Sequence, residues 1–199
     1  MKKALVLGLA AAVIIAGCGH GRNAEKTAET VDSFPLDSLE IKYNPVIEKG
    51  IPAPAFELPD TLGKVFSLND FKGDYLILYF WASWCGDCRR EIPEVKALFE
   101  EWKDRKIDGK AVRFLSVSFD HDAESWKNML RAEAFEWPQV SNLVKYRGHP
   151  LAAAYGIHWI PSIVIVDPDG NIAGAAITAR RVDFMLKQLN AHNHNSHNI

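Results

Sequence analysis

Hydrophobic residues along the chain change their spacing several times, and each change predicts a new element of structure. Residues 75–81 read Tyr-Leu-Ile-Leu-Tyr-Phe-Trp, an unbroken apolar run that is typical of a strand covered on both faces. Residues 112–119 read as a second strand. Between these strands, apolar residues recur at spacings of three and four, which predicts a helix over residues 91–103. The helical pattern is carried by Ile92, Val95, Leu98, Phe99 and Trp102.

The rest of the region from residue 50 to residue 191 continues the alternation of strand and helix patterns. Strand–helix–strand–helix followed by a hairpin and a helix predicts an α/β fold with a mixed central sheet flanked by helices. The further elements expected are an N-terminal β-hairpin over 56–58 and 64–67, an amphipathic helix over 123–135, a short helical turn over 150–155, a hairpin over 163–166 and 171–176, and a helix carrying Val182, Met185, Leu186 and Leu189.

The first residues carry the pattern of an export signal. Lys2 and Lys3 precede an apolar stretch over 4–16 that is too short for a comfortable membrane span. The stretch ends in Ile15-Ala16-Gly17-Cys18, which resembles a bacterial lipobox and implies cleavage before Cys18 and acylation of that residue. The alternative is a secretory signal cut near Ala16, with Cys18 an incidental thiol. Both interpretations place the protein outside the cytoplasm, and the first anchors it to a membrane of the cell envelope.

Four regions follow from these patterns. Residues 1–17 are expected to be a signal peptide and residues 18–49 a lipidated N-terminus and tether, whose second half is apolar enough to pack against the domain. Residues 50–191 are the globular domain, and the His/Asn-rich residues 192–199 are expected to be an unstructured polar tail, although its histidines could bind a metal weakly. Removal of Lys2 and Lys3 takes the formal charge from −2 to −4, which argues against a nucleic acid partner.

Candidate chemistry is concentrated in Trp84-Cys85-Gly86-Asp87-Cys88, directly after the first apolar strand. Two thiols separated by two residues at the start of a helix can close a small disulfide ring, and unpaired backbone N–H groups there favour a thiolate on the first sulfur. This pattern indicates a redox dithiol. Half of a zinc site looks the same, but zinc needs further ligands and the globular region has no other cysteine. Its scattered histidines, His121, His149 and His158, have no ligand-like spacing, so neither a metal nor a cofactor is expected.

Several stretches resemble the thioredoxin-like superfamily, in particular its TlpA/ResA-type thiol–disulfide oxidoreductases. Residues 80–93 match the active-site strand and helix of that group, and residues 50–68 resemble the β-hairpin that it adds to thioredoxin. Residues 123–139 match its central αβ insertion, and Ile160-Pro161-Ser162 matches the loop that carries a cis proline. The resemblance covers about residues 50–189 and implies a thioredoxin-like fold.

Each site residue has an expected role. Cys85, first of the pair and at the helix N-terminus, is the expected nucleophile, and Cys88, one helical turn later, is the resolving cysteine. By resemblance, Ile160 pairs its backbone with an extended substrate next to a cis Pro161. Trp84, which flanks the dithiol, is expected to shape the substrate surface, although most tryptophans pack in cores.

Glu91 is the candidate acid/base. Thioredoxin has a buried Asp six residues before its first cysteine, where this chain has Tyr79. The TlpA/ResA branch instead places a Glu three residues after the second cysteine, and Glu91 occupies that position. Such a carboxylate could accept the proton of Cys88 during resolution. The alternative is that Glu91 only favours the first turn of a helix.

The resemblance implies a membrane-anchored, extracytoplasmic thiol–disulfide oxidoreductase that reduces disulfide-bonded protein substrates and is itself reduced by a membrane electron donor. Asp87 beside Cys85 disfavours its thiolate and so favours the reductase direction slightly. Two alternatives share the fold. A thiol peroxidase would carry Thr or Ser three residues before the cysteine and Pro further upstream, where this chain has Ala82 and Leu78. A copper-binding assembly protein would carry C-x-x-x-C and a distant His, for which His158 is the candidate.

Overall fold

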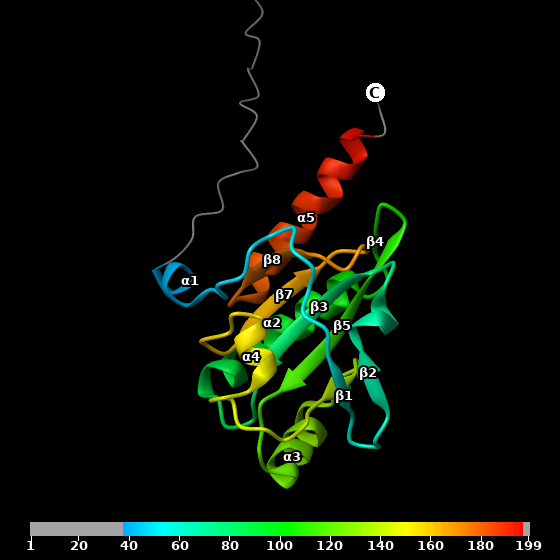
Figure 1. Cartoon of the computed structure of the whole chain (residues 1–199). Coiled ribbons are helices and arrows are strands. Elements are labelled where there is room, and N and C mark those ends of the chain that lie inside the picture. Colours follow the sequence, from blue (N-terminus) through cyan, green and yellow to red (C-terminus); the bar gives the residue numbers. More distant parts are fainter. Residues whose placement is uncertain (1–37, 197–199) are drawn as a thin grey trace, which may run out of the picture. The chain divides into compact units, whose positions relative to one another are not determined.

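The central sheet is mixed, as the strand pattern predicts (Figure 1). In this computed structural model, which describes residues 38–196 and side chains through His192, strand β3 (Tyr75–Trp81) lies in the middle. It pairs in parallel with β5 (Lys110–Ser118) and antiparallel with β7 (Ser162–Val166). On the far side of β7, β8 (Ile172–Ala176) is antiparallel, and on the far side of β5 lie the short strands β4 (Lys106–Ile107) and β6 (Gln139–Val140).

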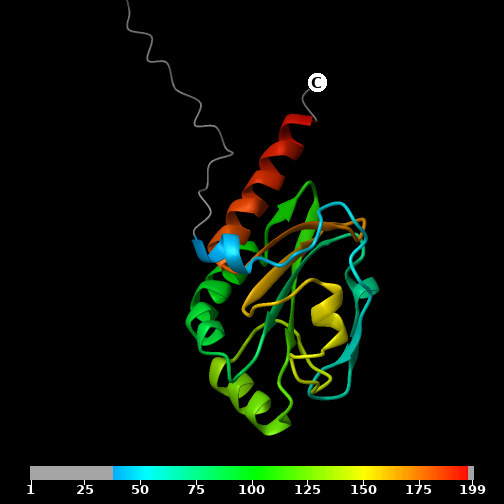
Figure 2. The same ribbon diagram turned by 60° about the vertical axis from the view of Figure 1, so that its left-hand side comes forward.

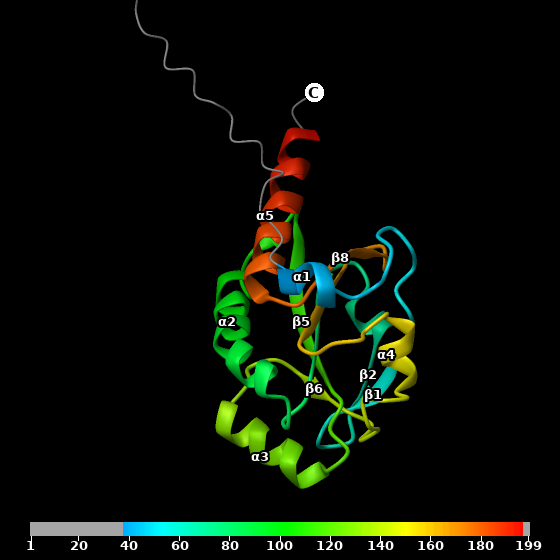
Figure 3. The same cartoon turned by 90° about the vertical axis from the view of Figure 1, so that its left-hand side faces the viewer.

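Helices and a hairpin cover both faces of the central sheet, and this explains why β3 is apolar at every position. Helices α2 (Gly86–Trp102) and α5 (Ala179–Ser196) cover one face of the sheet, while α4 (Pro150–Ala154) and the hairpin of β1 (Glu57–Pro59) and β2 (Val65–Ser67) lie on the other (Figures 2 and 3). All seven residues of β3 are buried between these layers. The expected αβ insertion is present as α3 (Ala123–Glu133) followed by β6.

Helix α2 begins earlier than the periodicity predicts. It starts at Gly86 rather than Glu91, so its first turn contains Cys88, and Pro93 lies inside the helix. The added turn, Gly-Asp-Cys-Arg-Arg, carries one apolar residue, and a hydrophobic pattern cannot register such a turn. Pro93 therefore does not mark the start of the helix. Because the helix begins at Gly86, its N-cap is Cys85 itself.

The end of the expected tether packs against the domain through Tyr43 and the polar residue Glu40. Helix α1 (Ser38–Tyr43) buries Glu40, which is 2% exposed, and leaves Leu39 and Ile41 exposed. Tyr43 stacks on Trp159, with ring centroids 4.2 Å apart. The folded region thus extends N-terminal of Gly50. Residues 1–37, with the expected signal peptide and Cys18, lie outside the described residues.

Helix α5 is longer than its apolar pattern. It continues to Ser196, so the boundary expected at His192 does not coincide with the end of regular structure. Two short elements were not expected either: the 3₁₀ turn η1 (Leu68–Phe71) and β4. Over residues 38–196, no helix combines the length and the apolar character that crossing a membrane requires.

Candidate active site

The two cysteines form a disulfide at the point where β3 gives way to α2. Their Cα atoms are 5.2 Å apart. Cys85 is 7% exposed and Cys88 is fully buried, so Cys85 is the more accessible of the two cysteines. The backbone N–H of Cys88 donates to Sγ of Cys85 over 3.1 Å. In the reduced protein, this N–H and the positive end of the helix dipole favour a thiolate at Cys85.

A second loop reaches the dithiol from 75 residues further along the chain. Sγ of Cys85 lies 3.5 Å from the carbonyl oxygen of Ile160, and the Ile160–Pro161 bond is cis, as the resemblance implies. A cavity of about 380 Å³ opens here, lined by Cys85 and Ile160 together with His158 and Trp159. The predicted residues Cys85, Cys88, Ile160 and Pro161 are thus brought together.

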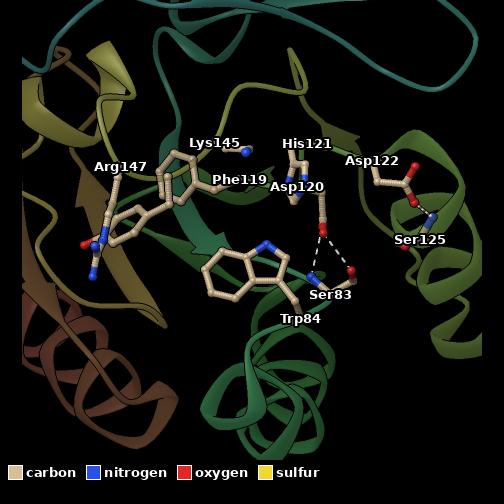
Figure 4. A pocket seen from close by; sticks show the side chains of 10 residues that line it. Ser83, Trp84, Phe119, Asp120, His121, Asp122, Ser125, Lys145 and Arg147 are labelled. Carbon is tan, nitrogen blue, oxygen red and sulfur yellow. Dashed lines mark hydrogen bonds between the residues drawn. The ribbon is translucent and has the colours of Figure 1, made fainter.

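Trp84 is the exposed member of the site. Its side chain stands 51% exposed beside Cys85, unlike the buried Trp81 and Trp102. It lines the 380 Å³ cavity and also a neighbouring cavity of about 490 Å³ (Figure 4). An aromatic ring exposed between two cavities is available to a substrate, and the substrate-shaping role of Trp84 stays a prediction.

Asp120 supports the active-site loop, a role that no sequence motif predicted. The residue follows β5 and is 1% exposed. Its carboxylate accepts hydrogen bonds from the N–H of Ser83 (2.9 Å), the hydroxyl of Ser83 (2.6 Å) and the hydroxyl of Ser118 (2.6 Å). Two of the three bonds hold the residue directly before Trp84 (Figure 4). The available signal was an acidic residue at the carboxyl end of a buried strand, where such sheets place their functional groups.

Asp120→Ala is expected to destabilise the domain by about 3 kcal/mol, because it leaves buried donors of Ser83 and Ser118 without an acceptor. Asp122→Ala is the matched control on the same loop. Asp122 is exposed and caps α3 by accepting from Ser125 N over 2.8 Å, so its loss should cost about 1 kcal/mol. Urea unfolding measures both values. Equal, small losses in the two variants would show that the Asp120 bonds are not needed to hold the loop.

Glu91 lies on α2, one turn after Cys88, and reaches the start of α5. Its Oε1 accepts a hydrogen bond from Ala179 N over 2.7 Å. Burial raises the pKa of its carboxyl group, while the Ala179 hydrogen bond opposes the rise and the charges of Glu94 and Glu40 add to it. Glu91 is therefore held in a fixed position, and the pKa of its carboxyl group is raised. Both are properties of a group that accepts a proton.

Tyr79 connects the strand beneath the site to Cys88. Its hydroxyl donates to the carbonyl oxygen of Cys88 over 3.3 Å, and burial, with a smaller effect of Glu91, raises its pKa far above the usual range. Tyr79 therefore stays a neutral donor and supplies no charge to the dithiol. The nearby carboxylate is that of Glu91.

Glu40 is a second carboxyl group at the start of α5; it is buried, whereas Glu91 is half-buried, and no sequence motif predicted it. Its Oε1 accepts from the hydroxyl of Thr178 over 2.9 Å, directly before the Ala179 that donates to Glu91. Two carboxyl groups from different segments thus meet one helix N-terminus, where N–H groups and the helix dipole favour negative charge. Nothing in the hydrophobic pattern marks Glu40, because the neighbouring Leu39 and Ile41 are the apolar residues.

Asp87 is paired in a way that reduces its effect on Cys85. It forms an ion pair with Arg90, one turn later on the exposed surface of α2. The positive guanidinium offsets the carboxylate, so the slight preference for reduction expected from Asp87 is smaller than the sequence suggests.

His121, His149 and His158 are not grouped as metal ligands in the structure. Within the described residues, no three His, Cys, Asp or Glu side chains are grouped as metal ligands. His149 is buried, its pKa is lowered by burial, and both ring nitrogens have partners, Leu151 N and Asn142 Oδ1. His158 is exposed and shares the 380 Å³ cavity with Cys85, as the copper alternative required, but its Nδ1 already bonds Gly156 O.

A β3–α2 dithiol beside a cis-proline loop on a mixed sheet defines a thioredoxin-like thiol–disulfide oxidoreductase. The AhpC/TSA family model matches residues 50–175, and the chain belongs to that family, as a TlpA/ResA-type thioredoxin-like protein.

Relatives of known sequence support the assignment. The chain is 29% identical to the thiol-disulfide oxidoreductase ResA of Bacillus thuringiensis, over 63% of this chain and 68% of the relative. It is 35% identical to the thioredoxin-like protein YneN of Bacillus subtilis, over 63% and 69%.

Solved structures agree with this fold. The thioredoxin domain of a thiol-disulfide oxidoreductase from Bacteroides vulgatus is 31% identical, with a TM-score of 0.61, and the match covers 73% of this chain and 98% of that domain. A thiol-disulfide oxidoreductase from Bacteroides fragilis is 30% identical, with a TM-score of 0.62, over 69% and 98%.

Proposed function

We propose that this protein reduces disulfides of other proteins outside the cytoplasm, while anchored to a membrane through Cys18. The observation that carries the redox part is the helix-capping disulfide, with Cys85 reachable from a cavity and Cys88 buried behind it. The signal pattern before Cys18 supports the anchor. Such an anchor would keep the domain close to a membrane electron donor.

The reaction starts from the reduced form. The Cys85 thiolate attacks one sulfur of the substrate disulfide, forms a mixed disulfide and releases the other substrate sulfur as a thiolate. Cys88 then gives its proton to Glu91 and attacks Sγ of Cys85, which closes the intramolecular disulfide and releases the second substrate sulfur. The substrate gains two electrons and the Cys85–Cys88 pair loses them. The electron donor returns the pair to the dithiol.

The thiol peroxidase alternative has less support. Ala82 supplies a buried methyl group where a hydroxyl would position peroxide. In addition, the partner of Cys85 lies one helical turn away, in reach for disulfide exchange. The copper alternative lacks a third ligand within the part of the chain that the structure describes.

Reduction of insulin by the chemically reduced protein tests the proposal. One mole of wild-type protein is expected to reduce about one mole of insulin disulfide without added reductant, because each dithiol carries two electrons. Cys85→Ala should lose this reaction. Rapid consumption of hydrogen peroxide together with inertness toward insulin would instead support the peroxidase.

A further inference from the structure

The 490 Å³ cavity beside Trp84 is not used by the chemistry described so far. It lies between the loop that follows β5 and residues 145–147, and it shares Trp84, Tyr146 and Arg147 with the cavity at Cys85. The two cavities are therefore adjacent. An extended chain whose cysteine lies at Cys85 would continue past the indole of Trp84 into the larger cavity.

The walls of this cavity combine aromatic surface with charged side chains of both signs. In Figure 4, Trp84 lies across the floor between Arg147 on one side and Asp120 and His121 on the other, with Lys145 above. Phe119 and Tyr146 add apolar surface, so a side chain that enters is flanked by rings.

The lining holds two carboxylates, Asp120 and Asp122, which already have partners, and two cations, Lys145 and Arg147. The carboxylate of Asp120 is buried and already accepts three hydrogen bonds. Asp122 is bound to Ser125 at the start of α3. Lys145 and Arg147 are exposed, and neither belongs to an ion pair among residues 38–192. A carboxylate placed here would meet two cations that have no competing partner.

We propose that this cavity is a specificity subsite for acidic protein segments: an Asp or Glu close to the substrate cysteine lies against Lys145 and Arg147, while the chain crosses Trp84. The inference rests on the proposed function, since it names the class of substrate for the same dithiol. It follows from the two cations, which have no ion-pair partner among residues 38–192 and therefore favour an anionic group of the ligand.

Binding of short peptides tests the subsite without any redox step. Three peptides carry a serine in the cysteine position and have Glu, Gln or Lys at the three positions on each side. Calorimetric titration into the oxidised full-length protein is expected to give about 3- to 10-fold tighter binding of the Glu peptide than of the Lys peptide, a range set by two exposed ion pairs. The preference should shrink in 0.5 M salt.

A charge-reversed variant with a matched control locates the effect. Lys145→Glu combined with Arg147→Glu should abolish or invert the preference. Lys106→Glu combined with Lys110→Glu makes the same change in net charge at the β4–β5 hairpin, at the opposite end of β5, and should keep the preference. Equal binding of all three peptides, or equal losses in the two double variants, would overturn the subsite.

Kinetics with the cysteine-containing peptide disulfides separate the two proposals. Reduction of all three peptides at the same rate would contradict the proposed subsite and would agree with the proposed reductase function. Selective binding of the Glu peptide without reduction of any peptide would contradict the proposed reductase function and would agree with the proposed subsite. Faster reduction of the Glu peptide, lost in the variant with both Lys145 and Arg147 replaced, would support both.

Discussion

Cys88→Ala is expected to turn the protein from a catalyst that completes the exchange into one that captures a single substrate. Cys88 is fully buried behind Cys85, and within the described residues it is the only other thiol. Without it, the mixed disulfide on Cys85 has no neighbouring sulfur to resolve it. Reduction of insulin should fall to the background rate, and non-reducing electrophoresis with mass spectrometry should find adducts on Cys85.

The controls for this experiment use the other two cysteines. Cys85→Ala should form no adduct, because the remaining Cys88 has no exposed surface. Both variants are best made with Cys18→Ser, so that the N-terminal thiol cannot form adducts of its own. Adducts on Cys88 in the Cys85→Ala protein would reverse the assigned order of attack. Normal insulin turnover by Cys88→Ala would remove the resolving role.

Local patterns predicted the sheet and the dithiol because both are encoded in contiguous residues. The run over β3 is apolar at each position since helices and a hairpin cover both faces of that strand. The spacing of Cys85 and Cys88 indicates a disulfide at a helix start without further knowledge of the fold. Together with the resemblance of residues 80–93, this was enough to place the redox centre.

Residues that act through distant contacts could not be predicted in this way. Glu40 is buried where Thr178, 138 residues away, bonds it at the start of α5, whereas its apolar neighbours Leu39 and Ile41 are exposed. Asp120 can bind Ser83 because β3 and β5 run in parallel, so that the residues after both strands lie at the same edge of the sheet. Such partners are set by the topology.

Glu91→Gln is expected to slow the resolving step by about 100-fold or more while leaving the protein folded, because general base catalysis contributes at least that much where it operates. The amide oxygen of Gln can still accept from Ala179 N, so the contact with α5 is kept and only the proton acceptor is lost. Rapid mixing of the reduced protein with a peptide disulfide, at several pH values, measures the rate at which Cys88 releases the substrate.

Stability provides the test that separates a base from a structural residue. Since burial raises the pKa of Glu91 in the folded state, the folded protein holds that proton more tightly than the unfolded chain does. The stability of the wild type should therefore fall as pH rises from the ordinary carboxyl pKa through the raised one. Glu91→Gln should lack this fall and be at least as stable at pH 7. A variant that is both slow and unstable at pH 7 would point to a structural role.

Glu40→Gln then tests whether the N-terminal segment tunes this base. The variant keeps an acceptor for Thr178 but removes one of the charges that raise the pKa of Glu91. The pH at which the resolving step reaches half its maximum should move downward, whereas Glu48→Gln, an exposed residue of the same segment, should leave it unchanged. An unchanged midpoint in Glu40→Gln would restrict Glu40 to holding α1 against α5. A lower midpoint would extend the active site to a residue that precedes the region matched by the family.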